Sequence, residues 1–384
     1  MAIIDKITYL DNAATTPVKP EVLEEMAPFL TDYFGNPSSA YNLGSWSFDK
    51  IEKSRNIIAD KLDVNLNEIY FTSGGSESNN WAIKGVALAN HGKGNHIITS
   101  KIEHPSVLNT CKYLEKLGFE ITYVDVDSNG IVDIGQVEKS IKPSTILISV
   151  MAVNNEVGSI QPINEISEIA RKKDIYFHTD AIQSFGKGFS NYRAKELDLL
   201  SISGHKIGAP KGIGALYIKE GTKIDNLIHG GGQEKGMRCG TENVAQIVGL
   251  GKATELAFEN IVKSTLNSQV MNDMFVKYIK NRFPTCKINC GSTIYRIPEI
   301  LSITFPNINA ETLMFLLSQK NIYVSVGSAC HSKSSEPSHV LTAMGLSEKD
   351  ARSTIRISFD GKIIPNFENI LKEICDTVDK MYNS

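Results

Sequence analysis

The sequence predicts an α/β fold with a mainly parallel sheet and a smaller α+β domain towards its C-terminal end. Runs rich in β-branched residues alternate with segments of helical period up to about residue 250, and the rhythm then changes to long helices. The length of 384 residues also exceeds that of one ordinary domain. Strands that alternate with helices of this size are typical of βαβ units, in which the strands run parallel.

The first part of the chain supplies the elements of the predicted sheet in order. The expected strands are 68–73, 96–100, 120–126, 145–153, 175–180, 197–203 and 214–218. The expected helices between them are 77–90, 105–118, 133–141 and 163–174. Each strand but the last two is followed by a helix or a long connection, which is the arrangement that parallel pairing requires.

After the change of rhythm, residues 249–283 have the pattern of one or two long helices. The expected strands that follow are 298–305, 322–326 and 354–359, with helices at 310–320 and 367–383. We therefore predict a large domain over 16–260. The small domain would comprise 1–15 and 261–384 and would carry a mobile loop at about 327–337 with Cys330.

Charge and composition exclude several classes of protein. The 41% of hydrophobic residues suffices to bury a large core, and 40 Lys and Arg balance 43 Asp and Glu, so no basic surface for nucleic acid or an anionic membrane is expected. No apolar run approaches the ~20 residues of a membrane span. The first residues carry charges at Asp5, Lys6 and Asp11 and resemble no signal peptide, so we expect a cytoplasmic protein.

The cysteines are widely and irregularly spaced, which argues against a disulfide framework in so large a chain. They are Cys111, Cys239, Cys286, Cys290, Cys330 and Cys375. The C-x₃-C pair at 286 and 290 cannot complete a tetrahedral zinc site by itself, and the simpler interpretation is a pair of core cysteines. We expect no resident metal.

A strand, a glycine-rich turn and a helix follow one another in FTSGGSESNNWAIKG, residues 71–85. Gly74 and Gly75 would let the backbone approach an anion, Ser76 offers a hydroxyl, and the start of the helix supplies free N–H groups. No Lys follows in the position that a Walker motif requires. The segment is either a phosphate-binding turn or an ordinary helix cap.

Two later strand ends decide between these alternatives. Asp180 ends the strand 175–180, where it could cap a helix or pair with a protonated pyridine nitrogen. Ser203, His205 and Lys206 follow the strand 197–203, and a desolvated lysine can act as an amine nucleophile that forms a Schiff base. A phosphate-binding turn, then a strand-end Asp, then Ser-x-His-Lys is the order expected of a pyridoxal phosphate site.

Short motifs occur in order along the whole chain, from residue 9 to residue 359. They are YLDNAATTP, GNPSS, FTSGGSESNN, EHPSV, NNEVG, HTDAIQ, SGHK, PKGIGALYI, RCGTENV, GSACHS, EPSHVL and TIRISF. These motifs resemble those of the NifS/IscS-type cysteine desulfurases, which are fold-type I pyridoxal phosphate-dependent transferases of the class V aminotransferase family. The short GSAC loop with EPSHVL close behind is similar to the first group of that family rather than to the Suf-type group.

The resemblance implies a role for individual residues in holding the cofactor. Lys206 would bind it covalently, Asp180 would pair with its ring nitrogen, His104 would stack over the ring, and Gln183 would hydrogen-bond its phenolic oxygen. The residues that would hold the phosphate are Gly75, Ser76, Ser203 and His205, with Thr241 reaching the phosphate of the neighbouring subunit. His104 could instead only open a helix, since Pro105 follows it.

For the substrate, the resemblance implies that Asn155 and Arg356 bind the carboxylate, the guanidinium through a bidentate pair. Arg356 in TIRIS could instead be a charge on the face of a strand. Taken singly, Gln183 and Asn155 would be interpreted as ordinary polar residues. Together with Lys206 and Asp180, they are interpreted as site residues.

Cys330 lies among small and polar residues in VSVGSACHSKSSEPSHV, residues 324–340. A thiolate that attacks a substrate sulfur and leaves with it needs exposure and a mobile tether, and a core position gives neither. We therefore interpret Cys330 as the sulfur carrier rather than as a chance surface cysteine. It could also ligate a nascent iron–sulfur cluster transiently.

Two departures from the family pattern concern these segments. Gly208 and Ala209 stand where many relatives have a bulkier residue and then Gly, so the wall beside Lys206 is expected to be more open. His331 stands where Thr is usual, and it could lower the pKa of the neighbouring thiol or merely point to solvent.

The resemblance implies a homodimeric, pyridoxal phosphate-dependent enzyme that converts L-cysteine to L-alanine and leaves a persulfide on Cys330. Lys206 would remove the α-proton, and His104 would relay a proton. A sulfur-acceptor protein, such as an iron–sulfur scaffold, would be the partner. The alternatives are a selenocysteine lyase or aminotransferase-like enzyme, in which Cys330 is dispensable, and a non-turnover assembly scaffold.

Overall fold

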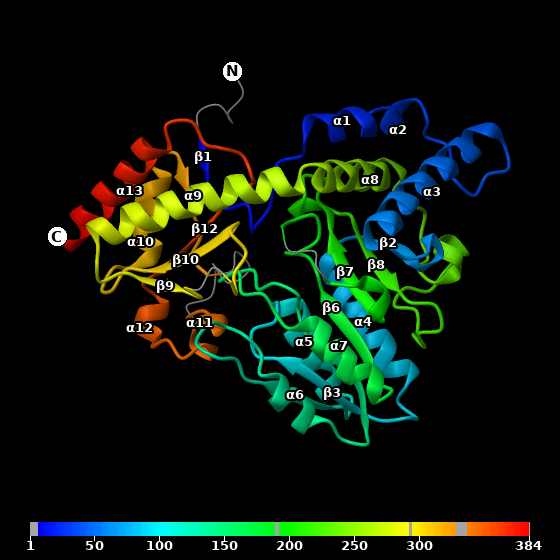
Figure 1. The fold of residues 1–384 in the computed structure, drawn as a ribbon. Coiled ribbons are helices and arrows are strands. Elements are labelled where there is room, and N and C mark those ends of the chain that lie inside the picture. Colours follow the sequence, from blue (N-terminus) through cyan, green and yellow to red (C-terminus); the bar gives the residue numbers. More distant parts are fainter. Residues whose placement is uncertain (1–6, 189–191, 292–293, 328–335, 384) are drawn as a thin grey trace.

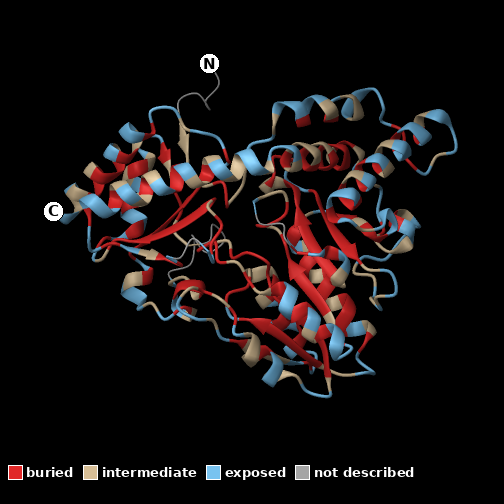
Figure 2. Ribbon diagram, viewed as in Figure 1, coloured by how far each residue is buried: buried red, intermediate tan, exposed pale blue. Residues whose placement is uncertain are grey.

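The structure is a computed structural model that describes residues 7–188, 192–291, 294–327 and 336–383. Two lobes, each built around its own sheet, are joined along one side by consecutive helices (Figure 1). Most strands of both sheets are buried, two edge strands less so, whereas most helices expose one side (Figure 2). None of the described helices combines the length and the apolar character that a membrane crossing requires.

The larger lobe contains a seven-stranded sheet of order β2-β8-β7-β6-β5-β3-β4. Its strands are β2 (Ile69–Thr72), β3 (His96–Ser100), β4 (Glu120–Val124), β5 (Thr145–Ser149), β6 (Tyr176–Asp180), β7 (Leu199–Ser203) and β8 (Gly214–Ile218). The pairings from β4 through β7 are parallel, and β8 pairs antiparallel with both β7 and β2. The predicted mainly parallel α/β sheet is confirmed.

Helices cover both faces of this sheet because its strands are apolar on both sides. Consecutive residues such as Leu199 and Leu200 belong to different core clusters, one on each face. One face is covered by α4 (Gly75–Ala89) and α5 (Pro105–Glu115), and the other by α1 (Pro20–Met26), α3 (Asn42–Leu62), α7 (Ile163–Lys172) and α8 (Val244–Glu259). Two short helices, α2 (Pro28–Thr31) and α6 (Ile134–Ser140), complete this lobe. A sheet covered in this way is typical of parallel α/β folds.

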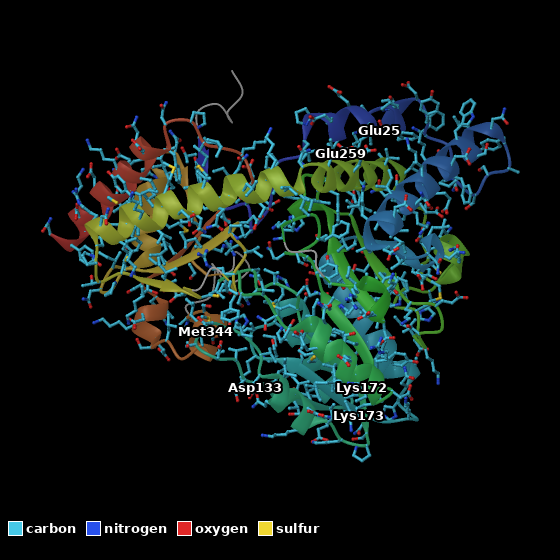
Figure 3. All side chains as sticks on the ribbon, in the orientation of Figure 1. Glu25, Asp133, Lys172, Lys173, Glu259 and Met344 are labelled. Carbon is cyan, nitrogen blue, oxygen red and sulfur yellow. The ribbon has the colours of Figure 1, made fainter. Side chains whose placement is uncertain are left out.

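The amphipathic pattern of α7 shows why such helices form. Ile163, Ile166 and Ala170 lie on one side at helical spacing and are buried. Lys172, in the last turn, is exposed and forms an i,i+4 ion pair with Glu168; Figure 3 labels Lys172 at the solvent-facing end of the helix. The positive charges of the last turn also suit the helix dipole.

The sequence pattern predicts no helix or strand between residues 20 and 62, yet this segment contains the 21-residue helix α3. The buried side of α3 includes Gly44, Ser47 and Ser54, so its apolar period is weak. Small residues allow close packing on α8, where a Cβ at Gly251 would lie 2.7 Å from Ser54 Oγ. Close approach of the two helices here adds to the apolar packing of Ile51 and Ile58 in the same core cluster.

The smaller lobe has a three-stranded antiparallel sheet of order β12-β10-β9. Its strands are β9 (Lys287–Asn289), β10 (Ile300–Thr304) and β12 (Thr354–Ser358). The helices are α9 (Ile261–Arg282), α10 (Ala310–Ser318), α11 (His339–Ala343), α12 (Glu348–Ala351) and α13 (Phe367–Tyr382). The strand expected over 322–326 is shorter, because β11 (Ile322–Tyr323) pairs only with β1 (Thr8–Tyr9).

Asn260 separates α8 from α9, and α9 contributes to the core of the smaller lobe. The pairing of β1 with β11 also brings the N-terminal strand to this lobe. The division into domains at residues 15 and 260 remains a prediction. The lobes also meet at α11, where Met344 packs with Met151 and Val157 in a shared apolar cluster; Figure 3 labels Met344 at this position.

The five described cysteines are all free and buried. Cys286 and Cys290 flank β9 on either side, which confirms that they are core cysteines.

Candidate active site

A cavity of about 570 Å³ opens at the carboxyl ends of β6 and β7, beside the N-terminus of α4. It brings together most of the residues predicted for the site. These are Gly75, Ser76, His104, Asn155, Asp180, Gln183, Ser203, His205, Lys206 and Arg356. Ligands of open parallel sheets usually bind at this end of the strands.

The N-terminus of α4 faces this cavity through Gly74, Gly75 and Ser76. A Cβ at Gly75 would lie only 2.0 Å from Ile182 Cδ1, so a larger residue would have to displace that side chain. The carboxylate of Glu77 accepts a hydrogen bond of 2.8 Å from the N–H of Ser73. The free N–H groups of the first helical turn suit an anionic group in the cavity.

Asp180 ends β6 and is almost completely buried, with 4% of its surface exposed. Its Oδ1 accepts a 3.0 Å hydrogen bond from the N–H of Ile182, and its Oδ2 accepts a 2.7 Å bond from Asn79 Nδ2. Burial raises the pKa of Asp180, while these hydrogen bonds and the charge of Lys206 oppose the rise. A cation placed beside this carboxylate would offset its desolvation.

Lys206 ends the short 3₁₀ helix Gly204–Lys206, which follows β7 directly. Its Nζ donates hydrogen bonds to the carbonyl oxygens of Ala13 (2.6 Å) and Ala14 (2.8 Å). The N-terminal segment therefore forms one side of the site and holds the amine in place.

The neighbouring His205 contacts the same segment, with 3.1 Å between its Nδ1 and Thr15 Oγ1. Burial and the nearby charges of Lys206 and other lysines lower the pKa of His205 to about 4. It is therefore neutral near pH 7, and any bond to a phosphate would use a neutral N–H donor.

Gln183 is oriented by two contacts of opposite kind. Its Oε1 accepts a 2.6 Å hydrogen bond from Lys187 Nζ, and its Nε2 donates one of 2.8 Å to the carbonyl oxygen of Ala13. An ammonium group can only donate, so the amide oxygen must face Lys187. Burial lowers the pKa of Lys187 to about 8, so the amine is still largely protonated at neutral pH.

His104 lines the cavity and is also the N-cap of α5, with Pro105 at the first helical position. Its Nδ1 accepts a hydrogen bond of 3.1 Å from the N–H of Ser106 and lies 2.8 Å from Ser106 Oγ. The two interpretations of this histidine are thus compatible, because the ring caps the helix and still reaches the cavity.

Arg356 lies on β12 with only 2% of its surface exposed, so it is not a solvated charge on a strand face. Its Nη2 forms a 2.6 Å ion pair with Asp11 Oδ1, and its Nη1 donates to the carbonyl oxygen of Asn155 at 2.9 Å. Within the described part of the chain, its buried Nε has no hydrogen-bond partner. An acceptor in the cavity is needed to satisfy this N–H.

Two predicted residues are not placed in the cavity. Cys330, with His331 beside it, lies outside the described residues. Thr241 is exposed and does not line the cavity of its own chain.

The loop that carries Thr241 is held by two bidentate ion pairs. Arg55 binds the two carboxylate oxygens of Glu234 at 2.7 and 2.8 Å, and both side chains are buried. Arg238 binds the two oxygens of Glu77 at 2.8 and 3.0 Å. The second pair ties this loop to the start of α4.

The space beside Gly208 is partly filled by Lys19. Gly208 has a φ of +91°, and a Cβ there would lie 2.7 Å from Lys19 Cγ. A small second cavity of about 100 Å³ remains on this side of Lys206, with Lys187 also on its wall. The open space beside Lys206 on this side is therefore limited to this small cavity.

The sequence did not reveal Asn79, Lys187 or the carbonyl groups of Ala13 and Ala14 as parts of the site. Asn79 and the two alanines lie in motifs that were already noted, FTSGGSESNN and YLDNAATTP. The polar residues of these motifs could have indicated a role in the site. Their hydrogen-bond partners, however, are far away in the sequence.

Residues 8–363 match the Aminotransferase class-V family. The chain is similar to a protein of Methanosarcina thermophila named cysteine desulfurase IscS, with 49% identity over 99% of this chain and 94% of the relative. A protein of Clostridium botulinum with the same name is 47% identical over 98% of this chain and 95% of the relative.

The chain belongs to the class V aminotransferase family, among the cysteine desulfurases of the IscS and NifS type.

Solved structures of this family agree with the assignment. A NifS-like protein superposes with a TM-score of 0.91 at 40% identity and covers 97% of this chain and 100% of its own. The structure titled SspA in complex with cysteine has a TM-score of 0.82 at 44% identity, with 93% and 100% covered. The fold is therefore that of the fold-type I enzymes, and pyridoxal phosphate is the general cofactor of this family.

Proposed function

We propose that this protein is a pyridoxal phosphate-dependent cysteine desulfurase that converts L-cysteine to L-alanine and leaves a persulfide on Cys330. The observation that carries the proposal is a single cavity to which three distant segments bring Lys206, Asp180 and Arg356. Relatives named cysteine desulfurase over nearly the whole length and a structure titled as a complex with cysteine support the choice of substrate.

The residues around the cavity suit pyridoxal phosphate. The start of α4, with Gly75 and Ser76, suits its phosphate, and the buried carboxylate of Asp180 suits a protonated ring nitrogen. Gln183 has an N–H group for a phenolic oxygen, since its own oxygen is bound by Lys187. When bound, the cofactor supplies a sink for the electron pair left at the α-carbon of the substrate.

The side chains of the cavity would then bind and deprotonate the substrate. Arg356 and Asn155 hold the carboxylate, for which Arg356, a lining residue of the cavity, has N–H groups beyond those bonded to Asp11 and Asn155. Lys206 would hold the cofactor, and its amine would remove the α-proton of the substrate. His104 accepts hydrogen bonds at Nδ1, so its Nε2 carries the proton that it would relay.

The sulfur transfer step uses the thiolate of Cys330. It attacks the sulfur of the substrate, so a sulfur–sulfur bond forms while the bond between that sulfur and the β-carbon breaks. The electron pair of the broken bond stays with the three-carbon product, which takes up protons to become alanine. The persulfide sulfur on Cys330 is then available to a sulfur-acceptor protein, such as an iron–sulfur scaffold.

Homodimerisation is part of the proposal. Thr241 is exposed on a loop that ion pairs hold rigidly, and it lies outside the cavity of its own chain. In a two-fold dimer this loop would complete the active site of the partner subunit. We further propose a cytoplasmic location and the domain division 16–260 against 1–15 and 261–384.

Mass spectrometry after reaction with L-cysteine tests the proposal. The purified protein, loaded with pyridoxal phosphate, is incubated with L-cysteine, its persulfides are trapped by alkylation, and the modified residue is located by peptide mapping. We expect one trapped persulfide, on Cys330, and equal amounts of alanine.

Variants separate the desulfurase from its alternatives. Cys330→Ala should bind the cofactor and lose alanine formation from L-cysteine, whereas Cys375→Ala, a buried cysteine on α13, should retain it. Normal turnover of L-cysteine by Cys330→Ala would favour an enzyme that does not need this thiol, such as a selenocysteine lyase. A wild-type protein without turnover of either amino acid would favour an assembly scaffold.

A further inference from the structure

A continuous hydrogen-bonded chain connects Asp180 with His104 beneath the cavity. Asn79, in the second turn of α4, donates from Nδ2 to Asp180 Oδ2 at 2.7 Å and to Ser106 Oγ at 2.9 Å. Ser106 Oγ in turn lies 2.8 Å from Nδ1 of His104. The residues of this chain come from α4, the end of β6 and the start of α5.

The chemistry of its ends sets the direction of this chain. An ionised carboxylate can only accept, and the amide nitrogen of Asn79, not its oxygen, faces Asp180 in the structure. The second N–H of the same nitrogen points to Ser106, whose hydroxyl can therefore turn its own proton to Nδ1 of His104. The N–H of Ser106 also donates to Nδ1 at 3.1 Å, so this nitrogen is an acceptor and the proton of a neutral His104 lies on Nε2.

Asn79 itself is not optimised for folding. It is fully buried, and its Oδ1 has no hydrogen-bond partner in the described part of the chain. A buried carbonyl oxygen without a donor is destabilising. The amide is thus held in the one orientation that serves its two partners, although its own oxygen remains unsatisfied.

The contact with Asp180 leaves room for a ligand. Each carboxylate oxygen has two acceptor positions, and the hydrogen bonds from Ile182 and Asn79 occupy one on each oxygen. A donor in the cavity can therefore bind Asp180 without displacing Asn79.

We propose that Asn79 is a positioning residue that orients the Asp180 carboxylate and, through the hydroxyl of Ser106, aims a second hydrogen-bond donor at Nδ1 of His104. The inference rests on the proposed function, since it assigns the two partners to the ring nitrogen and the ring face of the cofactor. The Asn79 side chain thereby links Asp180, which would bind the ring nitrogen, with His104, which would relay protons above the ring.

Three variants test the inference. Asn79→Ala removes both hydrogen bonds that Asn79 donates. Ser106→Ala removes only the hydroxyl that links Asn79 to His104 and leaves the hydrogen bond from Asn79 to Asp180. Asn90→Ala is a matched control, because Asn90 is a buried asparagine at the other end of α4 that donates to the carbonyl oxygens of Val86 (2.8 Å) and Lys223 (2.9 Å). It lies outside the cavity lining.

Two measurements are made on each variant. Equilibrium dialysis gives the dissociation constant for pyridoxal phosphate. Nitrogen-15 NMR of protein labelled at histidine, with His104→Gln to assign the signals, reports the hydrogen bonding of Nδ1 and which ring nitrogen carries the proton, both before and after loading with the cofactor.

We expect Asn79→Ala to bind the cofactor at least roughly tenfold more weakly, as the loss of a hydrogen bond to a charged group implies, and to shift the Nδ1 signal of His104, whose tautomer the N–H of Ser106 still holds. Ser106→Ala should shift the same signal with nearly unchanged affinity, because Nδ1 loses its hydroxyl donor, and Asn90→Ala should match the wild type in both. If Asn79→Ala does not fold, Asn79→Leu serves the same test, since it keeps a similar shape and loses both donated bonds.

Unchanged affinity together with an unchanged Nδ1 signal of His104 in the Asn79 variant would overturn the inference while leaving the proposed function intact. Equal loss in Asn79→Ala and Asn90→Ala would also overturn it, because a general effect of destabilising α4 would then suffice. A wild-type protein that does not bind pyridoxal phosphate would overturn the proposed function and the inference with it.

Discussion

Glu103, which precedes His104, is a buried acid whose protonation should control stability near neutral pH. Its Oε1 accepts hydrogen bonds from Ser100 Oγ at 2.6 Å and from the N–H of Met151 at 3.0 Å. Its buried Oε2 has no partner among the described residues. Burial, with a smaller contribution from the charge of Asp180, raises the pKa of Glu103 from 4.5 to about 8.

The direction of the pH dependence follows from this shift. Between about pH 4.5 and pH 8 the folded protein keeps a proton on Glu103 that the unfolded chain releases, so the free energy of unfolding falls as the pH rises. At 1.36 kcal/mol for each pKa unit, neutral Glu103 costs roughly 3 kcal/mol of folding stability at pH 7. Glu103→Gln has no proton to release and should avoid this loss.

The assay is denaturant unfolding of wild type and Glu103→Gln at about pH 5 and about pH 8. Since other groups also titrate, the informative quantity is the difference between the two proteins, which should grow by roughly 3 kcal/mol in favour of the variant. Glu120→Gln is the control, because the Glu120 side chain is 53% exposed. Infrared difference spectra should also show the carbonyl band of a protonated acid in wild type at pH 6 and not in Glu103→Gln.

A difference between wild type and Glu103→Gln that stays constant over this pH range would refute the reasoning, as would the absence of the acid band. Either result would mean that water or a side chain solvates Oε2 and keeps the carboxylate charged.

Two further predictions concern the substrate and the partner subunit. Arg356→Lys should raise KM for L-cysteine by roughly tenfold or more with a smaller change in kcat, because a charge-assisted bidentate contact is lost. Steady-state kinetics measure this, with a lysine substitution at the exposed Arg352 as the control. An unchanged KM in Arg356→Lys would contradict the role assigned to Arg356. Mixed Lys206→Ala and Thr241→Ala chains should regain roughly a quarter of the wild-type sites if Thr241 acts across a two-fold dimer. Activity after mixing that does not exceed the sum of the separate variants would contradict a shared site.

The sequence was sufficient for the sheet and for the residues at its strand ends. Asp180 and Lys206 could be predicted because each directly follows an apolar strand, and parallel strands bring their carboxyl ends to one edge of a sheet. Gly75 could be predicted because a glycine-rich turn leads into a helix. These inferences use only local order along the chain.

The contacts that complete the site depend on residues distant in sequence, which the local pattern does not contain. Lys206 is bound by the carbonyl of Ala13, and Asp180 by Asn79, across 193 and 101 residues respectively. Helix α3 was missed for a related reason, since small and polar residues such as Ser54 face α8 where an apolar stripe was sought.

The orientation of the polar groups in this site follows from partners that can only accept or only donate. Lys187 can only donate and therefore turns the oxygen of Gln183 towards itself, which leaves the amide N–H groups for Ala13 and the cavity. Asp180 can only accept and therefore turns the nitrogen of Asn79 towards itself. A flipped Gln183 amide would place its N–H groups against the donor Lys187. A flipped Asn79 amide would place its oxygen against the acceptor Asp180.

The same logic defines what the cavity can bind. Asn155 and Asp11 each take one N–H from the two Nη groups of Arg356, so the guanidinium keeps further N–H donors, among them a buried Nε without a partner in the described part of the chain. Asp180 retains acceptor positions that need a donor, and the start of α4 offers N–H groups to an anion. A ligand that satisfies all three must carry an anion at α4, a protonated nitrogen at Asp180 and a carboxylate at Arg356. Pyridoxal phosphate and an amino acid bound together would supply these three groups, whereas either molecule alone would leave at least one of them unsatisfied.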